Sequence, residues 1–424
     1  MNADARQVQR TYLTLTLLST FAASFIFGIN TLFLLDAGLT ATEAFVANAF
    51  YTAGMVIFEI PTGVVADTWG RRASFLLGAA TLLVSTFFYL ALWQIAAPLW
   101  LWAIASVFIG LGFTFFSGAV EAWLVDALDF TRYEGTLDSV FARGQVAAGI
   151  AMLSGSVAGG FVAQVTSLGV PYILRVVMLG LTLVVAFLYM RDLGFTPHSA
   201  RHPIREMKTI TSASLENGLR NPPVRWIMLA SPFTAGVGIY AFYAMQPYLL
   251  ELYGNPNAYT VAGLAAAIVA GAQIVGGLLV DRIRRLFGNR TTLLITTTSI
   301  SGLALLAIGL TSSFWIAIGG LVVWAMLFAV SMPVRQAYIN GLIPSQQRAT
   351  VLSFDALLGS SGAVGTQPVL GRVADVYGYS TSYVVSAAIQ VCAVPFVFLA
   401  RREKAGSDPM HADPGSTAEA APSS

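Results

Sequence analysis

Residues 63–72 read GVVADTWGRR, and they connect two long apolar segments, residues 41–66 and 73–94. Each segment exceeds the roughly 20 residues that an α-helix needs to cross about 30 Å of hydrocarbon. Further apolar segments of similar length lie on both sides. A backbone in hydrocarbon must satisfy its own hydrogen bonds, and these runs are continuous and not alternating. They therefore predict membrane-spanning helices and not the strands of a barrel.

The composition agrees with a membrane protein, because 56% of the 424 residues are hydrophobic and only 10% are charged. A typical soluble domain is about 25% charged. The expected fold class is an all-α membrane protein with twelve transmembrane helices. The first span follows two arginines, as a signal peptide does, but it is too long for one and is expected to be retained. The expected spans are residues 11–35, 41–66, 73–94, 98–126, 138–164, 170–190, 226–250, 258–280, 291–311, 314–340, 350–373 and 380–400.

The positive charges are distributed unevenly among the segments that join these spans. Of the 23 lysines and arginines, three lie deep within spans, and only Arg372, at the end of span 11, lies on the side of the loops after odd-numbered spans. The others lie in the terminal segments, in the loops after even-numbered spans and in the central segment. Cationic residues are retained on the cytoplasmic side of membranes. We therefore expect a multi-pass protein of the inner (plasma) membrane with both termini in the cytoplasm.

An internal repeat divides the chain into two halves. The G-x-x-x-D pattern of residues 63–67 recurs at residues 277–281, and Glu121 and Arg335 are related by the same offset. Two parallel repeats predict two six-helix bundles with a binding site between them near the middle of the membrane. The expected domains are an N-terminal bundle (1–190), a cytoplasmic linker (191–225), a C-terminal bundle (226–402) and a polar, disordered tail (403–424).

The loop at residues 63–72 resembles the signature G-x-x-x-D-(R/K)-x-G-(R/K)-(R/K) of the major facilitator superfamily, with Thr68 where a basic residue is usual. The resemblance covers nearly the whole chain and implies the fold of that family. It also implies a conformational switch that steadies the outward-facing state. The alternative is that these charges only determine topology. The residues of the expected switch are Gly63, Asp67, Gly70, Arg71 and, at the end of the fourth span, Asp126.

Two further stretches, EIPTG at residues 59–63 and EAWLVD at residues 121–126, resemble those of bacterial drug-efflux members. Other signatures of drug–proton antiporters are incomplete. Residues 155–160 read GSVAGG, without the proline of G-P-x-x-G-G, and Ser106 stands where those proteins carry an arginine in the fourth span. These departures weaken the case for proton antiport of the familiar kind.

Four ionisable residues deep in the spans suggest two buried ion pairs. Glu121 and Arg143 lie at similar depth in an antiparallel hairpin, as do Arg335 and Asp355 in the second half. Pairing would offset much of the cost of burying each charge. Either these pairs are structural clamps or they contribute to coupling or substrate binding. Arg175, near the other end of its span, is expected to extend its side chain toward the interface.

Glu59 is a candidate for proton coupling. It precedes Asp67 by eight residues, which places it about 12 Å inside the membrane at 1.5 Å per residue. A carboxylate in apolar surroundings favours its protonated form and can exchange a proton near neutral pH. The alternative is a protonated or water-bonded side chain that fixes a bend at Pro61.

The resemblance nominates spans 1, 4, 7 and 10 as the lining of a substrate cavity. Span 7 presents Tyr240, Tyr243 and Gln246 at intervals of three residues, and span 1 offers Asn30. An aromatic face with few charges suits a large, amphipathic or cationic organic substrate. The alternative is that these rings pack within the core.

The expected function is export of drug-like or amphipathic organic compounds by alternating access, coupled to protons. The alternative is a proton-coupled uptake symporter for a sugar or an organic anion. We expect no enzyme, cofactor or metal site, because there is one cysteine, no P-loop and no nucleophile–base constellation. The expected partners are a small-molecule substrate, protons and the lipid bilayer, with no nucleic acid and with the protein acting as a monomer.

Overall fold

The computed structural model describes residues 3–195, 218–344 and 348–410. Apart from an isolated bridge between Asn289 and Pro409, these residues form helices and the turns between them. The predicted all-α class is therefore confirmed. The linker between the halves falls largely outside the described residues, as does the end of the tail, residues 411–424.

The first half contains six expected spans in eight helices, because spans 1 and 4 are each broken in two. Gly118 adopts the left-handed conformation (φ 68°) and separates the two parts of span 4. The helices are α1 (Ala3–Phe27), α2 (Asn30–Asp36), α3 (Ala41–Trp69), α4 (Arg71–Gln94), α5 (Leu99–Phe116), α6 (Ala119–Phe130), α7 (Leu137–Val165) and α8 (Gly169–Tyr189).

The second half contains the other six expected spans. Its long helix α14 contains a break at Gly378 (φ 84°), which divides it between spans 11 and 12. The helices are α10 (Pro222–Tyr253), α11 (Tyr259–Arg284), α12 (Arg290–Leu310), α13 (Phe314–Asn340), α14 (Arg348–Val391) and α15 (Ala393–Arg402).

The helices are long and apolar enough to cross a membrane. Ten segments qualify by length and composition, and the bent pair α1 and α2 adds an eleventh. One of the ten is the 52-residue segment Val351–Arg402. At 1.5 Å per residue it is about 78 Å long, more than twice the roughly 30 Å of hydrocarbon, so it holds two spans. Counted in this way, the structure agrees with the twelve predicted spans.

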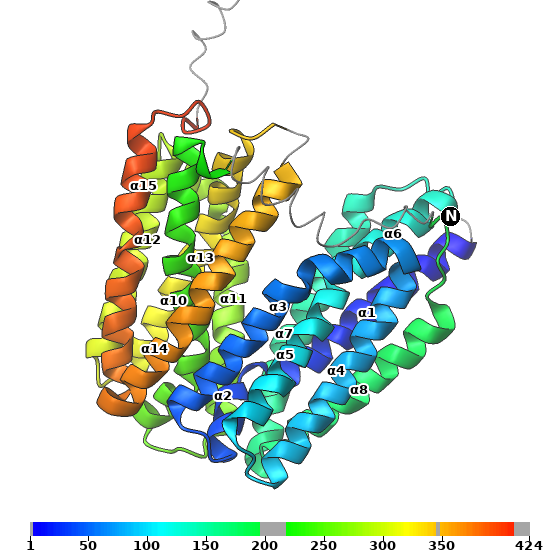
Figure 1. The fold of residues 1–424 in the computed structure, drawn as a ribbon, viewed down its shortest axis with the longest axis horizontal. Helices are drawn as coiled ribbons and strands as arrows, with labels where there is room; N and C mark the ends of the chain where they lie inside the picture. The colour runs from blue at the N-terminus through cyan, green and yellow to red at the C-terminus, as the bar shows by residue number, and fades with distance from the viewer. Residues whose placement is uncertain (1–2, 196–217, 345–347, 411–424) are drawn as a thin grey trace, which may run out of the picture.

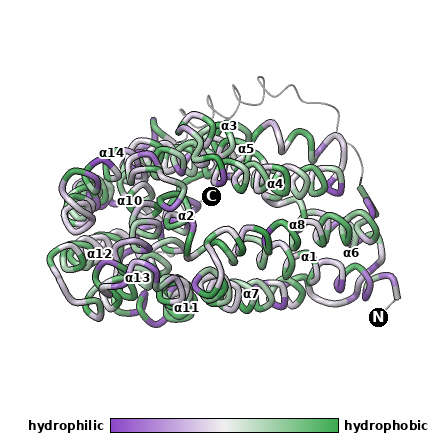
Figure 2. Tube along the Cα trace, turned by 90° about the horizontal axis from the view of Figure 1, so that it is seen from below, coloured by the Kyte–Doolittle hydropathy of each residue, from purple (hydrophilic) through white to green (hydrophobic). Residues whose placement is uncertain are grey.

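The two halves lie together at one end of the molecule and diverge toward the other (Figure 1). We call these the closed end, where α3 begins, and the open end, where α3 meets α4. Figure 2 shows α7 of the first half beside α11 of the second, with hydrophobic residues along most of both halves. The contact is close because two glycines meet there: an ideal Cβ on Gly160 would lie 3.0 Å from the Cα of Gly263.

The start of the predicted disordered tail is ordered. Asp408 accepts hydrogen bonds from the backbone N–H and the hydroxyl of Thr291, both at 2.8 Å, at the first residues of α12. The N–H of Arg290 donates to the carbonyl of Asp408 at 2.8 Å. A helix leaves its first N–H groups without partners, and this carboxylate supplies one. The prediction for residues 403–410 is therefore wrong, because composition does not reveal this cap.

Candidate functional site

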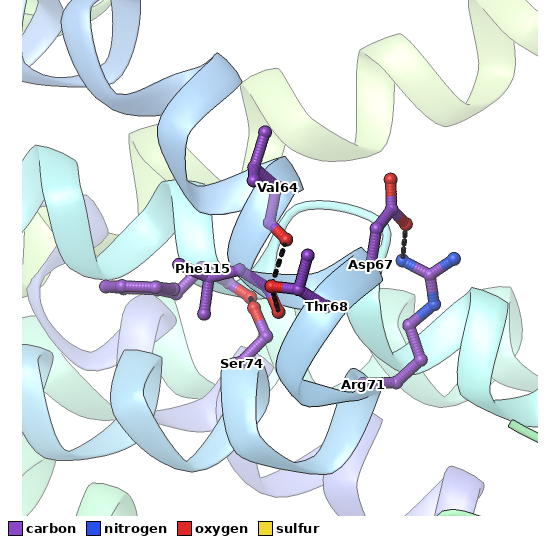
Figure 3. Close-up of polar contacts among 7 residues, drawn as sticks. Val64, Asp67, Thr68, Arg71, Ser74 and Phe115 are labelled. Atoms are coloured by element: carbon purple, nitrogen blue, oxygen red, sulfur yellow. Dashed lines mark hydrogen bonds and ion pairs between the residues drawn. The ribbon is translucent and has the colours of Figure 1, made fainter. Parts of the chain in front are cut away.

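The predicted switch loop lies at the open end, and the hydrogen bonds and ion pair described for it are all within its own half. Asp67 and Arg71 form an ion pair at 2.7 Å across the turn between α3 and α4 (Figure 3). Asp126, the expected switch residue at the end of the fourth span, does not pair with Arg71, whose partner is Asp67. Gly63 has nothing within 4 Å of an ideal Cβ, so it makes no close helix contact here. Gly70 has a φ of 102°, which favours glycine at the turn between α3 and α4.

The turn is held by residues that the sequence had not indicated. The carboxylate of Asp192, which follows α8, accepts a hydrogen bond from the N–H of Arg72 at 2.9 Å. The Arg72 guanidinium donates to the carbonyl of Phe187 at 2.8 Å. Ser74 donates to the carbonyl of Phe115 at 3.0 Å, also within the first half (Figure 3). The loop is thus fixed to its own bundle and leaves Asp67 half-exposed.

A second copy of this sequence lies at the closed end. Residues 371–378 read GRVADVYG, against GVVADTWG at residues 63–70. Its final glycine, Gly378, has nearly the same conformation as Gly70. Its carboxylate, Asp375, contacts the opposite half. It accepts hydrogen bonds at 2.8 Å from the N–H groups of Ala41 and Thr42, and one from the Thr42 hydroxyl, at the beginning of α3.

Gln246, predicted to line the substrate cavity, instead joins the two halves at the closed end. It is fully buried, accepts a hydrogen bond from the N–H of Thr31 at 2.8 Å and donates to the carbonyl of Phe27 at 3.0 Å. These partners lie on either side of the break between α1 and α2. Gln246 therefore satisfies backbone groups that the break leaves free.

Tyr240 is also placed in the core. Its ring is fully buried, and its hydroxyl donates to Ser382 at 2.6 Å within the second half. The periodicity of span 7 predicted that Tyr240, Tyr243 and Gln246 share one broad face of the helix. In the structure, Tyr240 and Gln246 are buried in the protein interior, and only Tyr243 of the three lines the cavity. Tyr243 and Asn30, the other two predicted residues, do line a cavity.

The cavity has a volume of about 250 Å³ and lies in the first half, against α10 of the second. Its walls are mostly aromatic and aliphatic, with a few polar groups. The lining residues are Ala23, Ile26, Phe27, Asn30, Asn48, Tyr51, Thr86, Tyr89, Ile109, Phe113, Met152, Tyr172, Arg175 and Tyr243.

Arg175 is a wall of this cavity, and the prediction that it extends to the interface is wrong. Its side chain is buried, with 2% of the residue exposed. The guanidinium donates from Nε to the Thr86 hydroxyl at 3.1 Å and from Nη1 to the carbonyl of Ala22 at 3.3 Å. It also lies 5.8 Å from the centre of the Phe113 ring. The cause is packing: α1, α4 and α5 surround this turn of α8, and depth along a span does not reveal it.

A chain of polar side chains also lines the cavity. Tyr172 donates to Asn30 Oδ1 at 2.9 Å, and Asn30 Nδ2 donates to Asn48 Oδ1 at 3.2 Å. The chain ends at Asn48 Nδ2, which is buried and has no hydrogen-bond partner among the described residues. A buried amide donor without a partner costs free energy, so its presence at a cavity points to a ligand or to water.

One of the two hypothesised ion pairs is present. Arg335 and Asp355 form a two-pronged ion pair, with 16% and 7% of their side chains exposed, and Arg335 also donates to the carbonyl of Ile227 at 3.2 Å. Glu121 and Arg143 are both exposed and do not pair. The reason is the break at Gly118, because it makes Glu121 part of the first turn of a separate helix, α6.

Glu59 is exposed and accepts a hydrogen bond from the Ser117 hydroxyl at 3.2 Å. Ser117 lies at the same break in span 4. Helix α3 continues through Pro61, and the Thr62 hydroxyl donates to the carbonyl of Phe58 at 2.8 Å. The role of Glu59 in proton coupling stays a prediction.

Sequence reasoning missed Arg175, Asn48 and Asp375. Asp375 had a signal, because the eight-residue repeat around it can be read from the printed sequence. Asn48 had none, since a single amide in a span is as consistent with helix packing as with a site.

Two helical bundles that meet at one end and diverge at the other, with a cavity in the first bundle against α10 of the second, are the architecture of secondary transporters. The chain belongs to the Major Facilitator Superfamily, whose family model matches residues 12–364 and 284–419.

Relatives agree with this assignment. An uncharacterised MFS-type transporter of Methanocaldococcus jannaschii is 20% identical over 380 residues, covering 89% of this chain and 93% of that protein. A crystal structure of the nucleoside transporter NupG has a TM-score of 0.76 at 10% identity, covering 95% of this chain and 100% of that one. For a D-xylose-proton symporter the TM-score is 0.69 at 16% identity, with 93% and 98% covered. At these identities the structures show likeness of fold alone.

Proposed function

We propose that this chain is a proton-coupled secondary transporter that exports small amphipathic organic compounds. The observation that carries the proposal is the cavity of about 250 Å³ next to the junction of the two halves, with aromatic walls and a few polar groups. Ligand sites of proteins have this character, being mostly apolar with a few polar groups that fix orientation.

The arrangement of the halves supports an alternating-access cycle. Among the described contacts, Asp375 and Gln246 join the halves at the closed end, whereas Asp67 at the open end pairs only within its own half. The asymmetry of positive charge favours the cytoplasm as the side of the open end. We therefore assign this structure to the inward-facing part of the cycle, in which a compound enters from the cytoplasm.

Glu59 is the proposed coupling residue. It is exposed beside the break in span 4, where Ser117 donates a hydrogen bond to it. A carboxylate in such a position can exchange a proton with water when its end of the protein is open and hold it when that end closes. Arg335 and Asp355 form a closed, mutually satisfied pair, which suits a structural clamp in the second half.

A second candidate function is proton-coupled uptake of a small metabolite through the same cavity. The size of the cavity favours it, because drug-sized ligands usually occupy pockets of about 300–1,000 Å³. Both functions use the same walls and differ in the direction of proton flow relative to the substrate.

The test is accumulation of a panel of dyes, antibiotics and radiolabelled organic acids in cells with and without the protein, repeated with a protonophore. Export predicts lower accumulation with the protein, reversed by the protonophore. Uptake predicts higher accumulation, abolished by it. Glu59→Gln should reduce the coupled component about tenfold or more, whereas Glu134→Gln, in an exposed turn, should not. If the protein changes the accumulation of none of these compounds, the proposal is wrong.

A further inference from the structure

Arg175 is a buried cation without a buried anion beside it. The described ion pairs are Arg71 with Asp67, Arg284 with Asp281 and Arg335 with Asp355, so none involves Arg175. Its described hydrogen-bond partners are neutral oxygens of Thr86 and Ala22, and its Nη2 has no hydrogen bond in the described part of the chain. Burying an unpaired charge in a membrane protein is costly, and such charges mark substrate or ion pathways.

Arg335 in the second half shows what a compensated arginine looks like in the same protein. Its side chain is more exposed than that of Arg175, yet Asp355 binds both of its terminal nitrogens. The less buried of the two arginines is thus the one that has a carboxylate partner. A buried arginine in this fold can therefore have a carboxylate partner, and the absence of one beside Arg175 is specific to the cavity.

The second unsatisfied group in the cavity wall is also a donor. Asn48 uses its oxygen to accept from Asn30, so only its Nδ2 is left, and that atom has no partner among the described residues. The residue is 5% exposed. A guanidinium and an amide N–H₂ that line the same cavity both require an acceptor, and a carboxylate offers two oxygens with about four lone pairs.

The rest of the cavity suits a ring. Tyr51, Tyr89, Phe113, Tyr172 and Tyr243 border it, and its volume equals that of about eight water molecules at about 30 Å³ each. That is room for a small planar molecule.

We propose that the substrate of this transporter is a small organic monocarboxylate with an aromatic or similar planar body, and that Arg175 and Asn48 bind its carboxylate. This rests on the proposed function and names the substrate class of the same cavity. The ligand supplies the charge that Arg175 lacks, so an empty site retains an uncompensated cation. Cationic organic compounds, which the sequence alone also suggested, are then poor substrates.

The test is the melting temperature of the purified full-length protein in lipid nanodiscs with matched pairs of probes: benzoate and benzamide, 4-hydroxyphenylacetate and its amide, indole-3-acetate and its amide. We expect at least one acid to raise the melting temperature and its amide to have no effect. Arg175→Gln should weaken that acid's apparent affinity about tenfold or more, since a charge-assisted hydrogen bond is lost. Arg175→Lys should retain part of it.

Two further variants are controls, the first for misfolding of the protein and the second for a general effect of charge. Thr86→Asp places a carboxylate next to Arg175 as an internal counter-charge, so it should fold with an unchanged or higher melting temperature and lose the response to acids. Arg285→Gln removes an exposed positive charge at the end of α11 and should respond as the parent protein does.

The inference is overturned if amides act as well as their acids, if Arg175→Gln responds normally, or if none of the acids binds. Failure of the proposed function looks different. A protein that binds an acid through Arg175 but does not move it across liposomes retains the inference and loses the transport role. A protein that moves neutral compounds unaffected by Arg175→Gln retains the role and loses the inference.

Discussion

Two copies of one short sequence stand at opposite ends of this molecule, and they differ in what their aspartates touch. In residues 63–70 Asp67 is half-exposed and pairs with Arg71, at the start of the next helix of the same half. In residues 371–378 Asp375 binds the first N–H groups of α3 in the opposite half. The two glycines that end these copies, Gly70 and Gly378, share nearly the same backbone conformation.

The sequence of such a loop therefore does not decide whether its aspartate binds the opposite half. The engaged aspartate meets a helix N-terminus, where unpaired N–H groups and the helix dipole favour a negative charge. The other has no such partner within reach in this structure. We expect the engagement to reverse when the open end closes, with Asp67 then binding the start of a helix in the second half.

The largest effect is expected from forcing the closed end apart. An ideal Cβ on Gly263 lies 2.5 Å from the carbonyl of Ser156, so Gly263→Leu cannot fit without moving α7 from α11. Overpacking of about 1–3 kcal/mol changes the ratio of two states about 5- to 150-fold. To measure this, spin labels are attached at Gln94→Cys and Asn255→Cys in a protein whose own cysteine is removed by Cys392→Ser. The distance between the two labels should be longer in Gly263→Leu than in the parent protein. Gly271→Leu on the same helix, where nothing lies within 4 Å, is the control.

A smaller shift is expected from Asp375→Ala. It removes three hydrogen bonds at the start of α3, and loss of a helix cap costs about 0.5–2 kcal/mol. The same labels should show the closed end opening in a larger fraction of molecules. Asp281→Ala removes an exposed carboxylate that pairs only with Arg284, so it should leave the distances unchanged. Equal distances in both variants would refute the role of Asp375.

The smallest effect on this state is expected from Asp67→Asn. The variant loses one surface ion pair across the turn between α3 and α4, worth about 0.2–1 kcal/mol. Label distances at the closed end should therefore stay as in the parent protein. Transport in the accumulation assay should nevertheless fall, because the state that needs Asp67 is the other one. If Asp67→Asn opens the closed end as Asp375→Ala does, the two copies do not act in alternation.

The predictions from sequence were correct where the length of an apolar segment, or the antiparallel course of two neighbouring helices, decides the structure. The spans follow from apolar runs, and the Arg335–Asp355 pair follows from equal depth on neighbouring helices. The same depth argument failed for Glu121 and Arg143, because Gly118 breaks the helix that was assumed to be continuous. Placing Arg175 requires knowing which helices surround α8, and this depends on contacts between residues far apart in the sequence.

The cap that Asp408 forms on α12 has a practical consequence for producing this protein. Shortening the chain after Arg402, where the last span ends, would remove Asp408 and leave the first N–H groups of α12 without their partner. Purification tags and reporter fusions should therefore follow Met410, so that residues 403–410 remain in place.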